Sequence, residues 1–100
     1  MGNMISDQWT IHIVGQAKKA GKTLPKNVTA SLSLLFIELK TMGPYRCDWP
    51  NYTKMKGLID DYHCHIEKGR PTYVACWRIL DKKQKIIEVY YAGTHEKAPY

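Results

Sequence analysis

The clearest candidates for chemistry lie in the last eight residues of the chain. His95, Lys97 and Tyr100 bring an imidazole, an ammonium and a phenol within six positions of one another. Groups of these types can transfer protons and stabilise negative charge on a phosphate. We therefore interpret His95, Lys97 and Tyr100 as candidate catalytic residues. The alternative is a C-terminal segment that only docks on the domain.

Two further imidazoles, those of His63 and His65, flank Cys64 in a strand-like run. Because side chains alternate along a strand, both imidazoles are expected on one face, about 7 Å apart. Such a pair can share acid–base work, bind a metal or be ordinary surface histidines. His95 and Glu67 are possible third ligands, but the spacing matches no standard zinc pattern. We predict catalytic roles for His63 and His65, and no metal or other cofactor.

Basic side chains surround these histidines in the sequence. The chain carries 15 basic and 9 acidic residues, a net charge of +6, which favours a polyanionic partner such as nucleic acid or the ribosome. Arginine binds phosphate with a planar fork and lysine with a point charge. Trp49 and Tyr52 could stack on bases, although Trp49 packed against a helix is the simpler interpretation. The candidate RNA-binding residues are Arg46, Lys54, Lys56, Arg70 and Arg78.

Length and composition narrow the class of protein. One hundred residues predict a single domain, residues 1–100, with one modest core. The sequence has no apolar run of about 18 residues and no secretory pattern, so we expect no membrane association. Its three cysteines form no CxxC pair, which favours reduced thiols and a cytoplasmic location. Cys64 and Cys76 are expected to point into the core.

The hydrophobic pattern predicts two helices and four strands. The longer helix begins at Leu24-Pro25, ends at Gly43-Pro44, and carries an apolar stripe. The stripe consists of Val28, Leu32, Leu35, Phe36, Leu39 and Met42. A shorter helix is expected near residues 15–21, and residues 44–57 are expected to form a loop. The strands are expected at residues 8–14, 58–66, 72–80 and 85–92.

Short connections between the last three strands predict an antiparallel meander. The expected fold is therefore α+β, in the order β-α-α-β-β-β. Two N-terminal helices would pack on one face of a small twisted, mainly antiparallel sheet. The opposite face would then be partly exposed, and it is the expected place for a site.

In this order the motifs resemble the RelE/ParE superfamily of toxin–antitoxin proteins. The resemblance rests on the helix pair with its Leu-Pro junction, the approach Lys54-Met55-Lys56-Gly57, the Tyr62–Ile66 strand, and a last strand that ends in Gly93-Thr94-His95 with a tyrosine soon after. It covers nearly the whole chain and is closest to HigB/RelE-like cytotoxic translational repressors. It implies a toxin with a RelE-like fold and a cognate antitoxin partner.

The resemblance further implies a metal-independent endoribonuclease, an mRNA interferase that cuts mRNA on the ribosome and so blocks translation. A ribose 2′-hydroxyl would attack the adjacent phosphodiester. His63 or His65 would act as base and His95 as acid, or the reverse. Lys97, Lys54 and Arg70 would stabilise the phosphate, and Tyr100 would orient the scissile group or stack on a base.

Some positions depart from the family's pattern. Glu96 and Val74 stand where arginine is common, and His63 and His65 replace a glutamate and an arginine. Two alternatives therefore stay open. One is a ParE-like toxin that inhibits DNA gyrase without nuclease activity. The other is an RNA-binding domain without catalysis.

Overall fold

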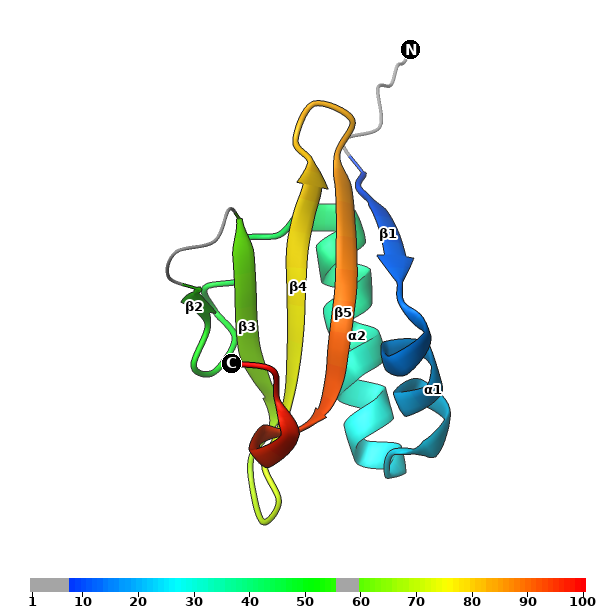
Figure 1. Ribbon diagram of the computed structural model, residues 1–100, viewed down its shortest axis with the longest axis vertical. Coiled ribbons are helices and arrows are strands. Elements are labelled where there is room, and N and C mark those ends of the chain that lie inside the picture. The colour runs from blue at the N-terminus through cyan, green and yellow to red at the C-terminus, as the bar shows by residue number, and fades with distance from the viewer. Residues whose placement is uncertain (1–7, 56–59) are drawn as a thin grey trace.

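Two helices cover one face of a five-stranded sheet in the computed structural model, which describes residues 8–55 and 60–100 (Figure 1). The predicted α+β architecture is confirmed. The elements are β1 (Thr10–Ile13), α1 (Gly15–Thr23), α2 (Lys26–Met42), β2 (Thr53–Lys54), β3 (Asp61–Glu67), β4 (Tyr73–Asp81), β5 (Ile86–Thr94) and the short 3-10 helix η1 (His95–Lys97).

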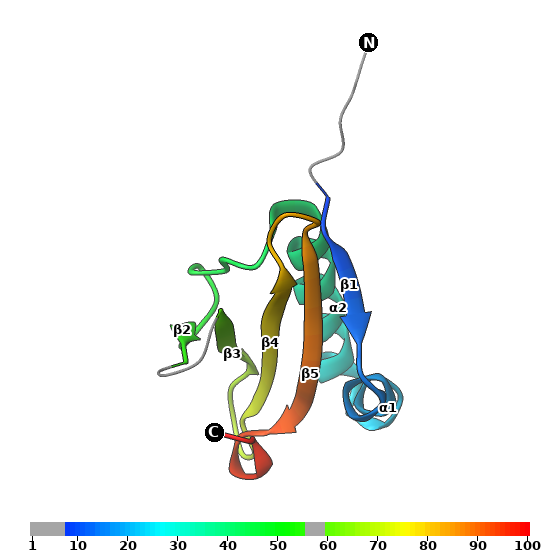
Figure 2. The ribbon, with the colours of Figure 1, turned by 45° about the horizontal axis from the view of Figure 1, so that its top comes forward.

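The strands follow the order β1-β5-β4-β3-β2 across the sheet. The predicted antiparallel meander β3-β4-β5 is confirmed, and β1 joins it parallel to β5, with Ile11 opposite Ile87. Strand β2 corrects the prediction of an uninterrupted loop, because Thr53 and Lys54 pair with β3. In the tilted view of Figure 2 α2 lies behind the meander and α1 lies beside β5, which leaves the other face of the meander uncovered by these two helices.

The core lies between α2 and the sheet. Along the predicted stripe, Val28, Leu32, Leu35 and Leu39 are buried, and Phe36 packs at the core's edge. Met42 is 58% exposed, so its predicted place in the core is wrong. It is the last residue of α2, and Gly43 turns the chain away with a φ of 95°. A residue there with a side chain would be strained, which fits a glycine at the helix end.

The open face, as we call the sheet face opposite the helices, has a small apolar cluster of its own. Val74, Cys76 and Tyr91 are buried there beneath Tyr90 and Ala98. The prediction that Cys64 and Cys76 are buried is confirmed, with Cys64 in the core on the helix side and Cys76 in the open-face cluster. No helix in residues 8–55 and 60–100 is long and apolar enough to cross a membrane.

Candidate active site on the open face

The register of β3 and β4 places the two strand histidines on the open face. His63 lies opposite Cys76 and His65 lies opposite Val74, and these two partners belong to the open-face cluster. Directly opposed residues of paired strands point to the same face. The predicted shared face of His63 and His65 is therefore observed, and Cys64 between them is fully buried on the other side.

The C-terminal segment returns across this face and completes the cluster. After β5, the amide of His95 donates to the carbonyl of Thr72 at 2.8 Å, which fixes η1 against the start of β4. The ring centroids of His65 and His95 are 5.5 Å apart, nearly at right angles. Tyr100 lies 4.2 Å from His63 and 5.9 Å from His95, centroid to centroid. Three imidazoles and one phenol thus converge on the open face.

A hollow of about 580 Å³ opens beside His65 and His95. The tight connection from β3 to β4 forms its other wall and contributes Arg70. The lining residues are His65, Gly69, Arg70, Pro71, Thr72, His95 and Glu96. Of these, Gly69, Pro71 and Thr72 were not singled out from the sequence, because only the folded turn brings them to the histidines, whereas Glu96 was noted as a departure from the family's pattern. The hollow combines two imidazoles and a guanidinium around a space of ligand size.

The strand histidines favour the neutral form. Burial lowers the pKa of His63, and the charges of His65 and His95 lower it further, while Asp61 acts in the opposite direction. Burial also lowers the pKa of His65, with smaller contributions from His95 and Lys68. A neutral imidazole near pH 7 can accept a proton, so either group is suited to act as a general base.

Tyr100 covers His63. Their rings are stacked at 25°, and the His63 Nδ1 atom also lies 3.1 Å from the Met55 sulfur. Burial raises the pKa of Tyr100 to about 12, so the phenol keeps its proton at neutral pH. It can donate a hydrogen bond or stack, but it is a poor base.

The buried carboxylate of Asp61 holds neighbouring side chains of the open face in place. Asp61 is 2% exposed and accepts a hydrogen bond from the Tyr90 hydroxyl. The Arg78 guanidinium lies 4.0 Å from the centre of the Tyr90 ring, and its Nε atom is 3.4 Å from a Glu88 carboxylate oxygen. Arg78 is thus on the open face, opposite Asp61, with 40% of its side chain exposed. Asp61 and Tyr90 were not identified from the sequence, although strand alternation from His63 already placed Asp61 on this face.

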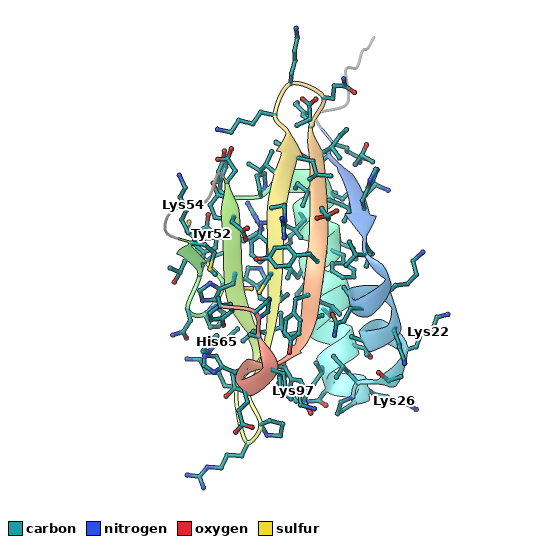
Figure 3. The ribbon with its side chains drawn as sticks, in the orientation of Figure 1. Lys22, Lys26, Tyr52, Lys54, His65 and Lys97 are labelled. Carbon is teal, nitrogen blue, oxygen red and sulfur yellow. The ribbon has the colours of Figure 1, made fainter. Side chains whose placement is uncertain are left out.

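Lys97 lies apart from the histidines. It lines a second groove, of about 390 Å³, between β5 and α1. Figure 3 shows Lys97 on the side of η1 toward the helices, whereas His65 is on the β3 side. Its predicted action beside the histidines stays a prediction, and the structure gives it different neighbours.

The remaining predicted RNA-binding residues differ in how exposed their side chains are and in whether they already have a partner within the protein. Arg46 pairs with Glu38 of α2 at 3.2 Å and its side chain is only 12% exposed, so it fastens the loop onto the helix. The Trp49 indole donates to the same carboxylate at 2.8 Å, which confirms packing against the helix. Lys54 is exposed on β2 and lies opposite Tyr62. Lys56 lies outside the described residues.

Cysteine and metal chemistry find little support in the described residues. Burial raises the pKa of both the Cys64 and the Cys76 thiol to about 12, so neither is a ready nucleophile, whereas Cys47 is exposed. Residues 8–55 and 60–100 contain no group of three or more His, Cys, Asp or Glu side chains placed to hold a metal ion.

Solved structures share this fold. The archaeal RelE–RelB complex from Pyrococcus horikoshii matches with a TM-score of 0.70 and 19% identity over 91% of this chain and 99% of the other. A free E. coli toxin RelE with two arginines replaced by alanine matches with a TM-score of 0.69 and 16% identity, over 91% and 87% of the two chains. The E. coli RelBE toxin–antitoxin complex gives a TM-score of 0.67 and 18% identity, over 89% and 99%.

In sequence, no protein-family model and no curated protein matches the chain. The helix pair, the mixed sheet and the element order nevertheless agree with the solved RelE structures over most of each chain. This chain therefore has the fold of the RelE toxins.

Proposed function

We propose that the protein is the toxin of a toxin–antitoxin pair and that it cleaves RNA with the histidines of the open face. The observation that carries the proposal is the convergence of His65 and His95 on one hollow, with Arg70 in its wall. Two imidazoles can serve as the base and the acid for cleavage of a phosphodiester by the adjacent 2′-hydroxyl, and a guanidinium can stabilise the negative charge that develops.

In the proposed reaction the neutral imidazole of His65 takes the proton of the ribose 2′-hydroxyl. The hydroxyl oxygen attacks the adjacent phosphorus, and the bond to the 5′-oxygen breaks. Protonated His95 gives its proton to that leaving oxygen. The products are a 2′,3′-cyclic phosphate and a 5′-hydroxyl, so charge and atoms balance without a further reactant. Arg70 stabilises the extra negative charge on the phosphorus oxygens.

His63 and Tyr100 form the neighbouring part of the site. Their stacked rings offer an aromatic surface about one strand repeat from His65, and a nucleobase stacks readily on such a surface. We assign them to holding the base next to the scissile phosphate. Arg78 lies farther along the same face, two residues from Cys76, where it can meet the RNA backbone.

The partners of the proposed function follow from the resemblance and from the related structures. Two of the similar RelE chains were solved in complex with RelB, so we propose an antitoxin that binds this protein. We take mRNA on the ribosome as the substrate that the resemblance implies.

Induced expression in bacterial cells, followed by mapping of RNA 5′ ends, tests the proposal. Growth arrest with codon-phased cuts in translated mRNA is the expected result, and His65→Ala and His95→Ala should abolish both. His12→Ala is the matched control, because His12 is an exposed histidine of β1. Gyrase-dependent DNA damage without RNA cuts would refute the proposal in favour of a gyrase inhibitor. Unchanged toxicity of a folded His95→Ala variant would also refute it.

A further inference from the structure

The strongest feature outside the histidine site is a run of positive charge on α1 and at the start of α2. From residue 8 to residue 37 the chain has no aspartate and no glutamate, but it has four lysines. They are Lys18, Lys19, Lys22 and Lys26, all exposed. The first turns of α1 and α2 likewise contain no acidic residue. This stretch of the chain therefore carries positive charge with no acidic residue within it.

The groove between α1 and β5 concentrates that charge. Lys19 of α1 and Lys97 of η1 line it from two elements that are distant in sequence. The full lining is Gln16, Lys19, Ala20, Thr23, Leu24, Tyr91, Ala92, Gly93, Thr94 and Lys97, with no carboxylate among them. Within the described part of the chain neither ammonium forms an ion pair. Two unpaired lysines that face one groove are suited to an anionic ligand.

The walls of the groove are held rigidly. The Gln16 amide bridges α1 and β5, because its nitrogen donates to the Ala92 carbonyl at 3.1 Å and its oxygen accepts from the Ala92 amide at 3.2 Å. The Tyr91 hydroxyl donates to the Thr94 carbonyl at 2.7 Å, which closes the end of β5. Lys19 and Lys97 are thus carried by backbone segments whose spacing is fixed before any ligand arrives.

The groove and the histidine hollow adjoin the same short element. His95 and Glu96 of η1 line the hollow, and Lys97 of η1 lines the groove. Only β4 and β5 separate His65 on β3 from α1, and neighbouring strands are about 5 Å apart. A single strand of a few nucleotides that occupies the hollow is therefore long enough to cross η1 and reach the groove.

We propose that this groove is a second RNA-binding site, in which Lys19 and Lys97 hold backbone phosphates of the strand whose neighbouring segment lies in the hollow. Lys18, Lys22 and Lys26 extend the field around it. The ligand chemistry is a phosphodiester backbone, because the lining offers ammonium, amide and hydroxyl groups. The inference rests on the proposed function only in taking RNA as the partner.

The salt dependence of RNA binding tests this inference. The probe is a fluorescein-labelled single-stranded RNA of about 12 nucleotides, long enough to span both regions. In the Lys19→Gln/Lys97→Gln variant we expect weaker binding and a slope of log K against log salt that is smaller by about 1.4, since each lost phosphate contact removes about 0.7 on a single strand. The matched control is Lys40→Gln/Lys83→Gln, which removes the same charge at exposed positions near the far end of the sheet and should change the slope by much less.

The outcomes separate this inference from the proposed function. An unchanged slope in Lys19→Gln/Lys97→Gln, or an equal change in the control, would overturn the groove while leaving the nuclease proposal intact. A smaller slope in Lys19→Gln/Lys97→Gln, together with no RNA cleavage in cells by the unmutated protein, would support RNA binding in the groove and refute the nuclease proposal. A labelled polyglutamate that binds more tightly than the RNA, with the same dependence on Lys19 and Lys97, would assign the groove to an acidic protein and overturn the proposal.

Discussion

The ring of Tyr100 lies over the imidazole of His63 at a centroid distance of 4.2 Å, with the two planes inclined by 25°. This contact joins the C-terminal segment to β3 and removes one face of the imidazole from water. It also makes Tyr100 part of the environment that sets the pKa of His63, because burial is the largest cause of the lowered value.

The first prediction concerns this stacked pair. In Tyr100→Ala the pKa of His63 should rise toward its ordinary value of 6.5, because water regains access to the ring. Tyr100→Phe keeps the stack and should leave that pKa nearly unchanged. Histidine side-chain NMR titrations measure both variants. A His63 pKa that is the same in all three proteins would contradict the contact.

The second prediction concerns the coupling between His95 and His65. The charge of His95 lowers the pKa of His65, so His95→Gln should raise it. His12→Gln, at an exposed position of β1, is the control substitution and should leave the pKa of His65 unchanged. A lowered or unaltered His65 pKa in His95→Gln would mean that the two rings do not interact in solution.

The third prediction concerns pH and stability. The folded pKa values of His63 and His65 lie below the unfolded value of 6.5, so between these values the unfolded chain binds more protons. Stability should therefore be fully present above pH 6.5 and decline as the pH falls through the folded values. Urea unfolding from pH 8 to pH 5 measures the slope, which should be shallower in His63→Gln/His65→Gln. Equal slopes in both proteins would disprove this origin.

The fourth prediction concerns the buried carboxylate. Tyr90→Phe removes the hydroxyl that donates to Asp61, and it should cost about 1–3 kcal/mol of unfolding free energy because the carboxylate stays buried with one donor fewer. A double-mutant cycle with Asp61→Asn isolates the pair and should give a coupling energy of about 0.5–3 kcal/mol. Additive effects of the two substitutions would show that the bond contributes nothing.

The fifth prediction compares neighbouring leucines of α2. Leu35 is fully buried and Leu34 is 51% exposed. Leu35→Ala should destabilise the fold by about 2–5 kcal/mol, since it leaves a cavity against the sheet. Leu34→Ala should stay within about 0.5 kcal/mol. Similar losses at both positions would mean that the outer face of α2 is covered in solution, for instance by a second copy of the chain.

Local patterns predicted much of this architecture. The apolar stripe of α2, the Gly43-Pro44 stop and the alternation around His63 follow from the geometry of single elements, and the structure agrees with them. The position of β1 in the sheet could not be predicted from the geometry of single elements. Its parallel pairing with β5 depends on how the helix pair crosses the sheet, and no short stretch of sequence encodes that.

The exact placement of residues at the site has the same origin. Cys76 lies on the open face because it pairs with His63, and this register between strands is set by the turn and by irregular pairing rather than by the residues around Cys76. A further shift in the pairing of β4 with β5 brings both Tyr90 and Tyr91 to the open-face cluster, which strict alternation forbids. Lys97 follows a turn of η1 that directs it toward α1. Each of these positions depends on contacts between residues that are distant in the sequence.

The contrast between the three thiols has a practical consequence. Cys47 is accessible, whereas Cys64 and Cys76 are buried and protonated at neutral pH. A maleimide dye should therefore alkylate the native chain at one position, on the loop that follows α2. The unmutated protein thereby offers a single-fluorophore reporter for titrations with RNA or with an antitoxin.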